Sequence, residues 1–243
     1  MRTLLANELR KIRRERFVWA VLVLNVVPLA MVVVNYAVNG GEPTLERFYF
    51  TFHNQYTMVL PLVVCATVAA CFHTEFRNGT YFEWLTCGRS KPALWAAKLA
   101  VACALVVVMA AVNHVGLVVF LLLENAGAGI GRMSAAYWLL VGVCVASVAL
   151  LCALLTLVTR NVVIVNVFGI GLTVATLVFM AADFSYVIPT CFAYRLSVGV
   201  VVPDAAYPDP GQALAVGWTV TALSLLLPLA ANLLVITRRR YLH

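Results

Sequence analysis

Segment 75–92 gathers side chains that can form specific polar and aromatic contacts. It reads Glu-Phe-Arg-Asn-Gly-Thr-Tyr-Phe-Glu-Trp-Leu-Thr-Cys-Gly-Arg-Ser-Lys-Pro and lies between two long apolar stretches. Aromatic rings and arginines are enriched where proteins bind each other. The chemistry that this pattern indicates is therefore recognition of another protein at the membrane face, not the making or breaking of bonds.

The same segment contains signals for a short helix. Gly79 can adopt a positive φ and allow a sharp change of direction. Thr80 is a candidate N-cap, and Glu83 three residues later completes a capping box. This helix would lie along the membrane surface and carry three aromatic side chains, Tyr81, Phe82 and Trp84. The alternative is an ordinary interfacial helix whose aromatic rings sit at headgroup level.

Motifs for catalysis or metal binding are missing from the sequence. The seven cysteines form no C-x-x-C pair, and the four histidines lack the spacing of metal ligands. Neither a G-x-S-x-G elbow nor a P-loop is present. The sequence thus predicts a chain that is not an enzyme and holds no cofactor or metal. If ATP drives its work, another polypeptide must bind the nucleotide.

A few polar side chains interrupt the apolar stretches: Asn25, Asn35, Asn113, His114 and Asn166. Polar groups at membrane depth cost free energy unless they find partners or face a cavity. They therefore indicate either hydrogen bonding between helices or a pathway for a substrate. No acidic or basic residue lies at the centre of an apolar run, which argues against a carrier driven by protons or sodium ions.

Composition places the chain in the membrane. It is 63% hydrophobic and 11% charged, against about 25% charged in an ordinary soluble domain. Runs of about 20 apolar residues are needed to cross the hydrocarbon core. Six such runs are present, at 17–38, 48–72, 93–123, 135–159, 162–182 and 212–237. The prediction is an all-α, polytopic membrane protein with six transmembrane helices in one domain, 1–243.

The basic residues predict the orientation of these spans. All but Arg47, Arg132 and Arg195 of the 17 lysines and arginines fall on the side of the two termini. Positive residues stay in the cytoplasm, so both termini are expected there. The net charge of +7 is then explained by topology and attraction to anionic headgroups, without a nucleic-acid partner. Residues 1–16 predict a basic amphipathic helix that lies in the lipid interface.

The outer segment 183–211 is apolar but too short on either side of Pro189 to span the membrane. Two interpretations stay open. It either dips into the outer leaflet and returns, or forms an aromatic-rich loop at the interface.

The cytoplasmic segment resembles that of ABC-2 type transporter permeases, which read roughly E-x-x-x-G-T followed by leucine, a turn with arginine, and a lysine in the next helix. The matching positions are Glu75, Gly79, Thr80, Leu85, Arg89 and Lys98. The closest likeness is to the small bacterial permeases for bacitracin and lantibiotic export, or immunity. One departure is the turn itself, which reads Cys-Gly-Arg-Ser-Lys-Pro at 87–92 where that family often has Pro-Val-Ser-Arg.

This resemblance implies a permease subunit of an ABC exporter in the bacterial cytoplasmic membrane. It would move a hydrophobic or amphipathic compound, such as a peptide antibiotic, out of the cell. A second permease chain, identical or different, would complete the pathway, and ATP-binding cassette subunits would carry ATP and Mg. The helix after Gly79 would be the coupling helix, anchored by its aromatic residues. Its polar contacts to the ATPase would come from Glu75, Arg77, Glu83, Arg89 and Lys91.

A different interpretation keeps the same binding segment. The chain could be a membrane subunit that does not transport, such as an assembly or sensor partner in a larger complex of the ABC type. Export by a reconstituted complex distinguishes the two.

Overall fold

The computed structural model describes residues 2–12, 15–39, 44–77 and 90–238, and these residues form helices and turns but no strand. The α-helices are α1 (Arg2–Ile12), α2 (Phe17–Asn39), α3 (Leu45–Arg77), α5 (Lys91–Leu123), α6 (Ile130–Thr159), α7 (Val162–Phe179), α8 (Pro189–Val201) and α9 (Pro210–Arg238). Two short 3₁₀ helices, η1 (Asp183–Val187) and η2 (Pro203–Ala205), flank α8.

Six helices are long and apolar enough to cross a membrane: α2, α3, α5, α6, α7 and α9. The prediction of an all-α protein with six transmembrane helices is therefore confirmed. Helix α3 continues through Arg77 and α6 begins at Ile130, so both extend beyond the apolar runs. The predicted coupling helix falls within 78–89, outside the described residues.

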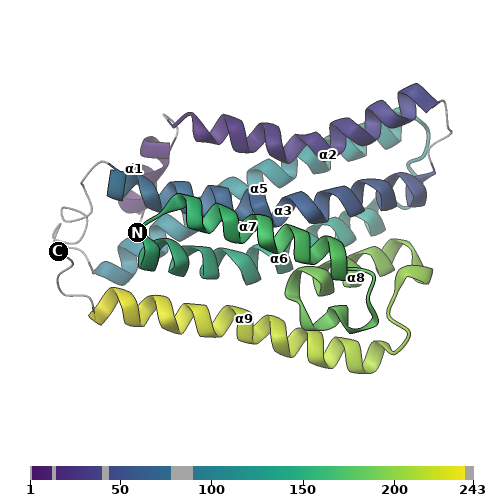
Figure 1. Cartoon of the computed structure of the whole chain (residues 1–243). Helices are drawn as coiled ribbons and strands as arrows, with labels where there is room; N and C mark the ends of the chain where they lie inside the picture. The colour runs from purple at the N-terminus through teal and green to yellow at the C-terminus, as the bar shows by residue number, and fades with distance from the viewer. Residues whose placement is uncertain (1, 13–14, 40–43, 78–89, 239–243) are drawn as a thin grey trace.

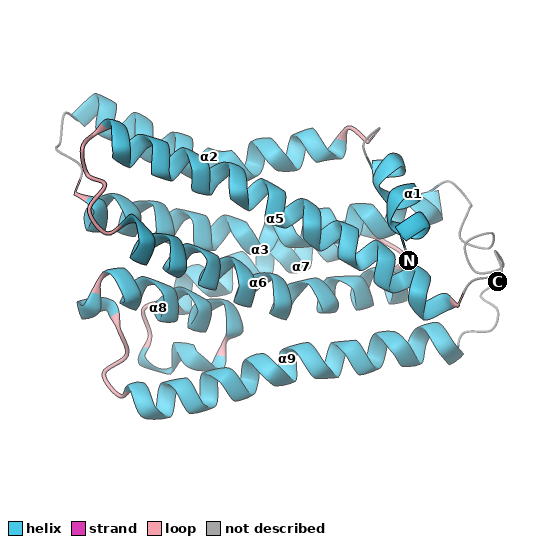
Figure 2. Cartoon of the chain, turned by 180° about the vertical axis from the view of Figure 1, so that it is seen from behind, coloured by secondary structure: helices cyan, strands magenta, loops and turns pink. Residues whose placement is uncertain are grey.

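Helix α3 lies at the centre of the bundle. It contacts α2, α5, α6, α7 and α8, while α6 in turn contacts α8 and α9. Figure 1 shows α1 at one end of the bundle and α8 at the other; Figure 2 shows the same layout from behind, with α9 along the edge next to α6. We refer to these two ends as the α1 end and the α8 end. The segment 78–89 connects α3 to α5 at the α1 end.

The packing is that of a membrane protein. Apolar side chains of α3 and α6, such as Leu60 and Leu140, are almost completely buried. Near the α8 end, the rings of Tyr56 and Tyr137 stack with centroids 5.5 Å apart. The outer helices instead expose valines and leucines along their length. Such a surface is unfavourable in water and suited to lipid.

The turn between α6 and α7 is short because Arg160 adopts a left-handed conformation, with φ at 53°. The side chain of Asn161 then caps α7 by accepting a hydrogen bond from the backbone N–H of Val163 at 2.8 Å. An asparagine cap satisfies one of the first N–H groups of the helix. This turn places α7 against α3.

Segment 183–211 folds around α8. This helix begins at Pro189 and packs against α6 and α3. The hydroxyls of Thr176 and Thr190 are 2.7 Å apart and join α8 to α7. The Arg195 guanidinium donates to the carbonyl of Ala182 at 3.1 Å. These two contacts join α8 to α7 and to the residues that follow α7.

Candidate functional site

Four charged side chains meet at the α1 end. The Lys98 ammonium of α5 lies 2.6 Å from the Glu8 carboxylate of α1 and 3.0 Å from the Glu75 carboxylate of α3. The Lys11 ammonium of α1 lies 2.8 Å from Glu75 and 3.2 Å from Glu8. Each cation therefore contacts both carboxylates. We call Glu8, Lys11, Glu75 and Lys98 the charge cluster.

The charge cluster is almost closed to solvent. The side chains of Lys98, Glu75 and Glu8 are 1%, 5% and 8% exposed, whereas that of Lys11 is 48% exposed. Lys98 also donates to the carbonyl of Cys71 at 3.1 Å. Two positive and two negative groups balance, which a buried ionic site requires because an unpaired buried charge is very costly.

The two carboxylates keep Lys11 charged. Burial alone lowers the pKa of its ammonium, but the hydrogen bond to Glu75 and the charges of Glu8 and Glu75 outweigh this effect and raise the pKa above its ordinary value. A raised lysine pKa means that the stabilising contact is fully present at neutral pH and is lost only as pH rises through that pKa. Lys11 therefore stays charged at neutral pH in this contact.

Local geometry brings these residues together. Glu8 and Lys11 are three apart on α1 and so share a helix face, and Cys71 and Glu75 are four apart on α3. Lys98 follows about two turns after the start of α5, where Ser90 is the N-cap and a proline occupies the first turn. The cluster therefore ties α1 to both helices that flank segment 78–89.

The predicted coupling residues are distributed unevenly. The Glu75 carboxylate points into the bundle and belongs to the charge cluster. Arg77 is the last residue of α3, and Lys91 is the first of α5, partly exposed. The remaining predicted coupling residues lie outside the described residues: Gly79, Thr80, Tyr81, Phe82, Glu83, Trp84 and Arg89.

Two members of the charge cluster, Glu8 and Lys11, were missed by the sequence analysis. A signal was present, because Glu8 shares a helix face with Leu5 and Ile12, and Ile12 is buried. A carboxylate on the apolar face of a basic helix indicates a buried cation opposite it. Lys98 was identified only as a motif position, although it is buried within α5.

Polar side chains also join α2, α3 and α5 inside the membrane. The Asn25 amide donates to the carbonyl of Met109 at 2.8 Å, and the Asn113 amide donates to the carbonyl of Asn25 at 2.8 Å. The Tyr56 hydroxyl donates to the Asn25 side-chain oxygen at 3.2 Å. Both asparagines are completely buried. Their position is that of groups that pack helices together.

The other three polar candidates make no hydrogen bond to this pair among the described residues. Asn35 is exposed and accepts a hydrogen bond from Asn39 at 2.6 Å. The His114 ring nitrogen is 2.8 Å from the hydroxyl of Ser134. Asn166 is half-buried on α7, and its side-chain oxygen has no hydrogen-bond partner among the described residues. The structure does not bring these residues together into one pathway.

Replacing Asn25 by leucine tests the packing role. The variant loses the bonds to Met109 and Tyr56 but keeps the bond that Asn113 makes to the backbone. We expect a loss of about 1 kcal/mol in stability, since hydrogen bonds between membrane helices average about 0.6 kcal/mol. Thermal melting in detergent measures it, with Asn35→Leu as the exposed control. If Asn25→Leu has the same melting temperature as wild type, the packing role is wrong.

No group of three metal-ligating side chains occurs in the described part of the chain. The role that this end of the bundle supports is mechanical, because its contacts hold helices together. The charge cluster forms a buried ionic joint between α1, α3 and α5, close to the two helix ends that flank segment 78–89.

Comparison with known families gives one match. Residues 4–180 match the family model described as "ABC-2 family transporter protein". The matched region includes all four residues of the charge cluster and the segment 78–89. No curated protein and no solved structure matches this chain.

Proposed function

Because the chain belongs to the ABC-2 family of transporter proteins, we propose that it is the permease subunit of an ATP-driven exporter. ATP and Mg are bound by separate ATP-binding cassette subunits, and a second permease chain, identical or related, completes the membrane pathway. Both termini face the cytoplasm, in line with the distribution of basic residues. The α1 end is thus the end at which the ATPases dock.

The observation that carries this proposal is the place of the charge cluster. Segment 78–89 follows the end of α3 and precedes the start of α5. Glu75 and Lys98, one on each of these helices, are joined by an ion pair of 3.0 Å, and Glu8 and Lys11 bind α1 to the same pair. A displacement of the segment therefore moves three helices as one body.

This arrangement suits a transporter driven from outside the membrane. Nucleotide binding closes the ATPases against each other, and the segment seated in them is displaced. Rigid elements with buried, specific contacts transmit such displacements, whereas a flexible connection absorbs them. Helix α3 contacts most of the other spans. A movement of α3 is therefore transmitted directly to α6, α7 and α8 through their contacts with it.

Within this mechanism the predicted coupling residues take two different tasks. Glu75 stabilises the charge cluster from within the bundle. Contact with the ATPase falls to the residues of the segment itself, the aromatic anchors Tyr81, Phe82 and Trp84 together with Glu83 and Arg89. Aromatic and arginine side chains supply most of the binding free energy at protein interfaces.

The cargo that we propose is a hydrophobic or amphipathic compound, such as a peptide antibiotic. Its support is the resemblance of segment 75–98 to the bacitracin and lantibiotic permeases. The absence of acidic or basic side chains from the described outer half of α5 and α6, other than Arg132 near the start of α6, agrees with an apolar cargo.

Photo-cross-linking from position 84 tests the docking assignment. A photoreactive phenylalanine analogue replaces Trp84 in the native membrane, and the adducts are identified by mass spectrometry. The matched control is the same analogue at Trp218, which is exposed on α9 toward the α8 end. We expect an ATP-binding subunit in the adducts from position 84 only. An ATPase adduct from neither position, or equally from both, contradicts the assignment.

A further inference from the structure

A partly exposed stripe of α3 lies between α2 and α7. Both outer helices contact α3, and Figure 1 shows them on either side of it. The half-buried residues of α3 recur at helical spacing along this seam: Val59, Leu62, Ala66, Ala70 and His73. Val59 and Ala66 pack beside residues of α2, and Leu62 approaches Gly169 of α7. The stripe is apolar until its last residue, His73, at the α1 end.

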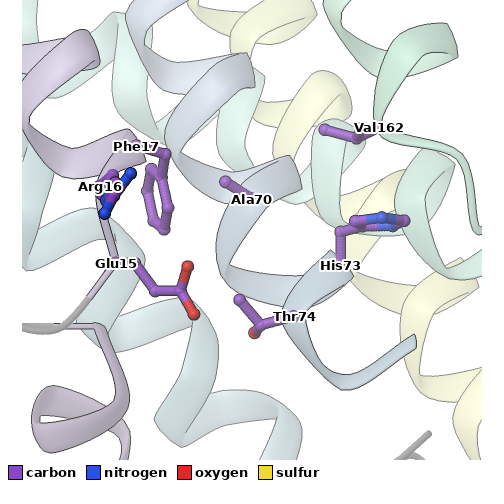
Figure 3. A pocket seen from close by; sticks show the side chains of 7 residues that line it. All are labelled: Glu15, Arg16, Phe17, Ala70, His73, Thr74 and Val162. Atoms are coloured by element: carbon purple, nitrogen blue, oxygen red, sulfur yellow. The ribbon is translucent and has the colours of Figure 1, made fainter. Parts of the chain in front are cut away.

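A pocket of about 540 Å³ opens at that end of the stripe. Figure 3 shows the residues that line it, which come from the start of α2 and the two residues before it, the last turns of α3 and the start of α7. They are Glu15, Arg16, Phe17, Ala70, His73, Thr74 and Val162. Polar groups therefore surround the mouth, and apolar groups lead from it into the seam.

The pocket lies at the depth of the lipid headgroups. Phe17 and Val162 are the first residues of two membrane spans, α2 and α7. Directly beyond them, Trp19 and Val23 on α2 and Val163 on α7 are each more than 60% exposed. Apolar surface of this kind faces the acyl chains, so the level of Arg16 and His73 is the boundary between hydrocarbon and water.

The polar groups suit a phosphate. Arg16 carries a guanidinium whose fork of N–H donors matches phosphate oxygens. His73 offers an imidazole, and its Nδ1 atom is buried without a hydrogen-bond partner among the described residues. His73 also lines the pocket, and an imidazole N–H can donate to a phosphate oxygen. Glu15, which lines the same pocket, is engaged in interactions of its own.

We propose that this pocket binds a glycerophospholipid of the leaflet on the α1 side. Its phosphate lies between Arg16 and His73, and one acyl chain follows the stripe of Ala70, Ala66 and Leu62. The combination of a polar mouth that contains Arg16 and an apolar seam is what separates a phospholipid site from a general basic surface, which attracts headgroups without holding a chain.

The lipid would brace the last turns of α3. Ala70, His73 and Thr74 line the pocket, whereas Glu75 belongs to the charge cluster and the carbonyl of Cys71 accepts a hydrogen bond from Lys98. A bound phospholipid therefore packs beside the helix that leads into segment 78–89. We expect the lipid to raise the melting temperature of the chain, because a ligand that binds only the folded state stabilises it.

Native mass spectrometry of the purified full chain in detergent tests the site. Phosphatidylglycerol and phosphatidylethanolamine are titrated against diacylglycerol, which has the same chains but no phosphate. We expect one phospholipid to be retained per chain, and little diacylglycerol. The Arg16→Gln/His73→Gln variant should bind both phospholipids about tenfold more weakly or worse, while Arg10→Gln, an exposed charge loss on α1 outside the pocket, should bind like wild type.

A second variant removes no charge. Ala70→Phe places a ring at the start of the seam and should weaken phospholipid binding by blocking the acyl chain, while the chain remains monodisperse in detergent. Three results overturn the site: unchanged binding by both pocket variants, an equal loss with Arg10→Gln, or equal retention of diacylglycerol.

Discussion

Replacing Lys98 by methionine is expected to destabilise the protein by about 3–5 kcal/mol, the usual cost of removing one partner from a buried ion pair. Methionine is close to lysine in length, but the substitution removes the most buried cation of the charge cluster from the nearly buried carboxylates of Glu8 and Glu75, and the other cation, Lys11, is half exposed. We expect a large drop in melting temperature in detergent and little folded protein in the membrane. Thermal unfolding followed by tryptophan fluorescence measures the change.

Lys91→Met is the matched control, because Lys91 is partly exposed at the start of α5. It should melt close to wild type, since surface charges contribute about 0–1 kcal/mol. Adding Glu8→Gln to Lys98→Met leaves one carboxylate, Glu75, with one cation, Lys11, and should recover part of the lost stability. Strictly additive effects in this double-mutant cycle are the result that contradicts a direct contact.

Replacing Glu75 by glutamine is expected to separate ATP hydrolysis from movement of the spans. The amide keeps the shape of the side chain but leaves Lys11 and Lys98 facing only Glu8. The joint between α3 and α5 is then weakened, while segment 78–89, which we propose contacts the ATPase, keeps its sequence. We expect the complex to continue to hydrolyse ATP, but the nucleotide to have little effect on the membrane helices.

Hydrogen–deuterium exchange of the complex, with and without ATP and vanadate, measures this effect without knowledge of the cargo. In wild type, exchange at the α1 end of α3 and α5 should respond to trapped nucleotide, and in Glu75→Gln the response should be lost. Glu46→Gln is the control, since Glu46 is an exposed acid paired with Arg132 at the α8 end. Gly79→Val alters the turn that the sequence predicts at Gly79. This variant is expected to lose the nucleotide response in the same way as Glu75→Gln. A full nucleotide response in both variants contradicts the role of the joint.

The fold was readable from the sequence because one force dominates it. Apolar runs long enough to cross the membrane have few alternatives to a helix, since lipid offers no partners for the backbone. The ends of the spans were less readable. Helix α3 continues through Thr74, Glu75 and Arg77, where the sequence becomes polar. Helical hydrogen bonding and the contact between Glu75 and Lys98 stabilise this last part of the helix.

The charge cluster was only partly readable. Glu75 and Lys98 follow from the resemblance, but their direct contact depends on how α3 and α5 pack. Glu8 and Lys11 join the charge cluster because α1 folds back against α5. No local sequence pattern specifies this contact between the two helices. Asn25 and Asn113 show the same limit. Their residue types indicate a polar group that needs a partner, and only the packing of α2 against α5 identifies the partner.

Recovery of the chain from native membranes in mild detergent, with identification of what remains bound, tests the central claim most directly. A subunit with a P-loop should copurify with wild type and with Glu75→Gln, and be lost when Tyr81, Phe82 and Trp84 are changed to alanine. The isolated complex should hydrolyse ATP, whereas the chain alone should not. If the folded wild-type chain brings down no ATPase, or the alanine variant retains it, segment 78–89 is not the docking element of an ABC permease.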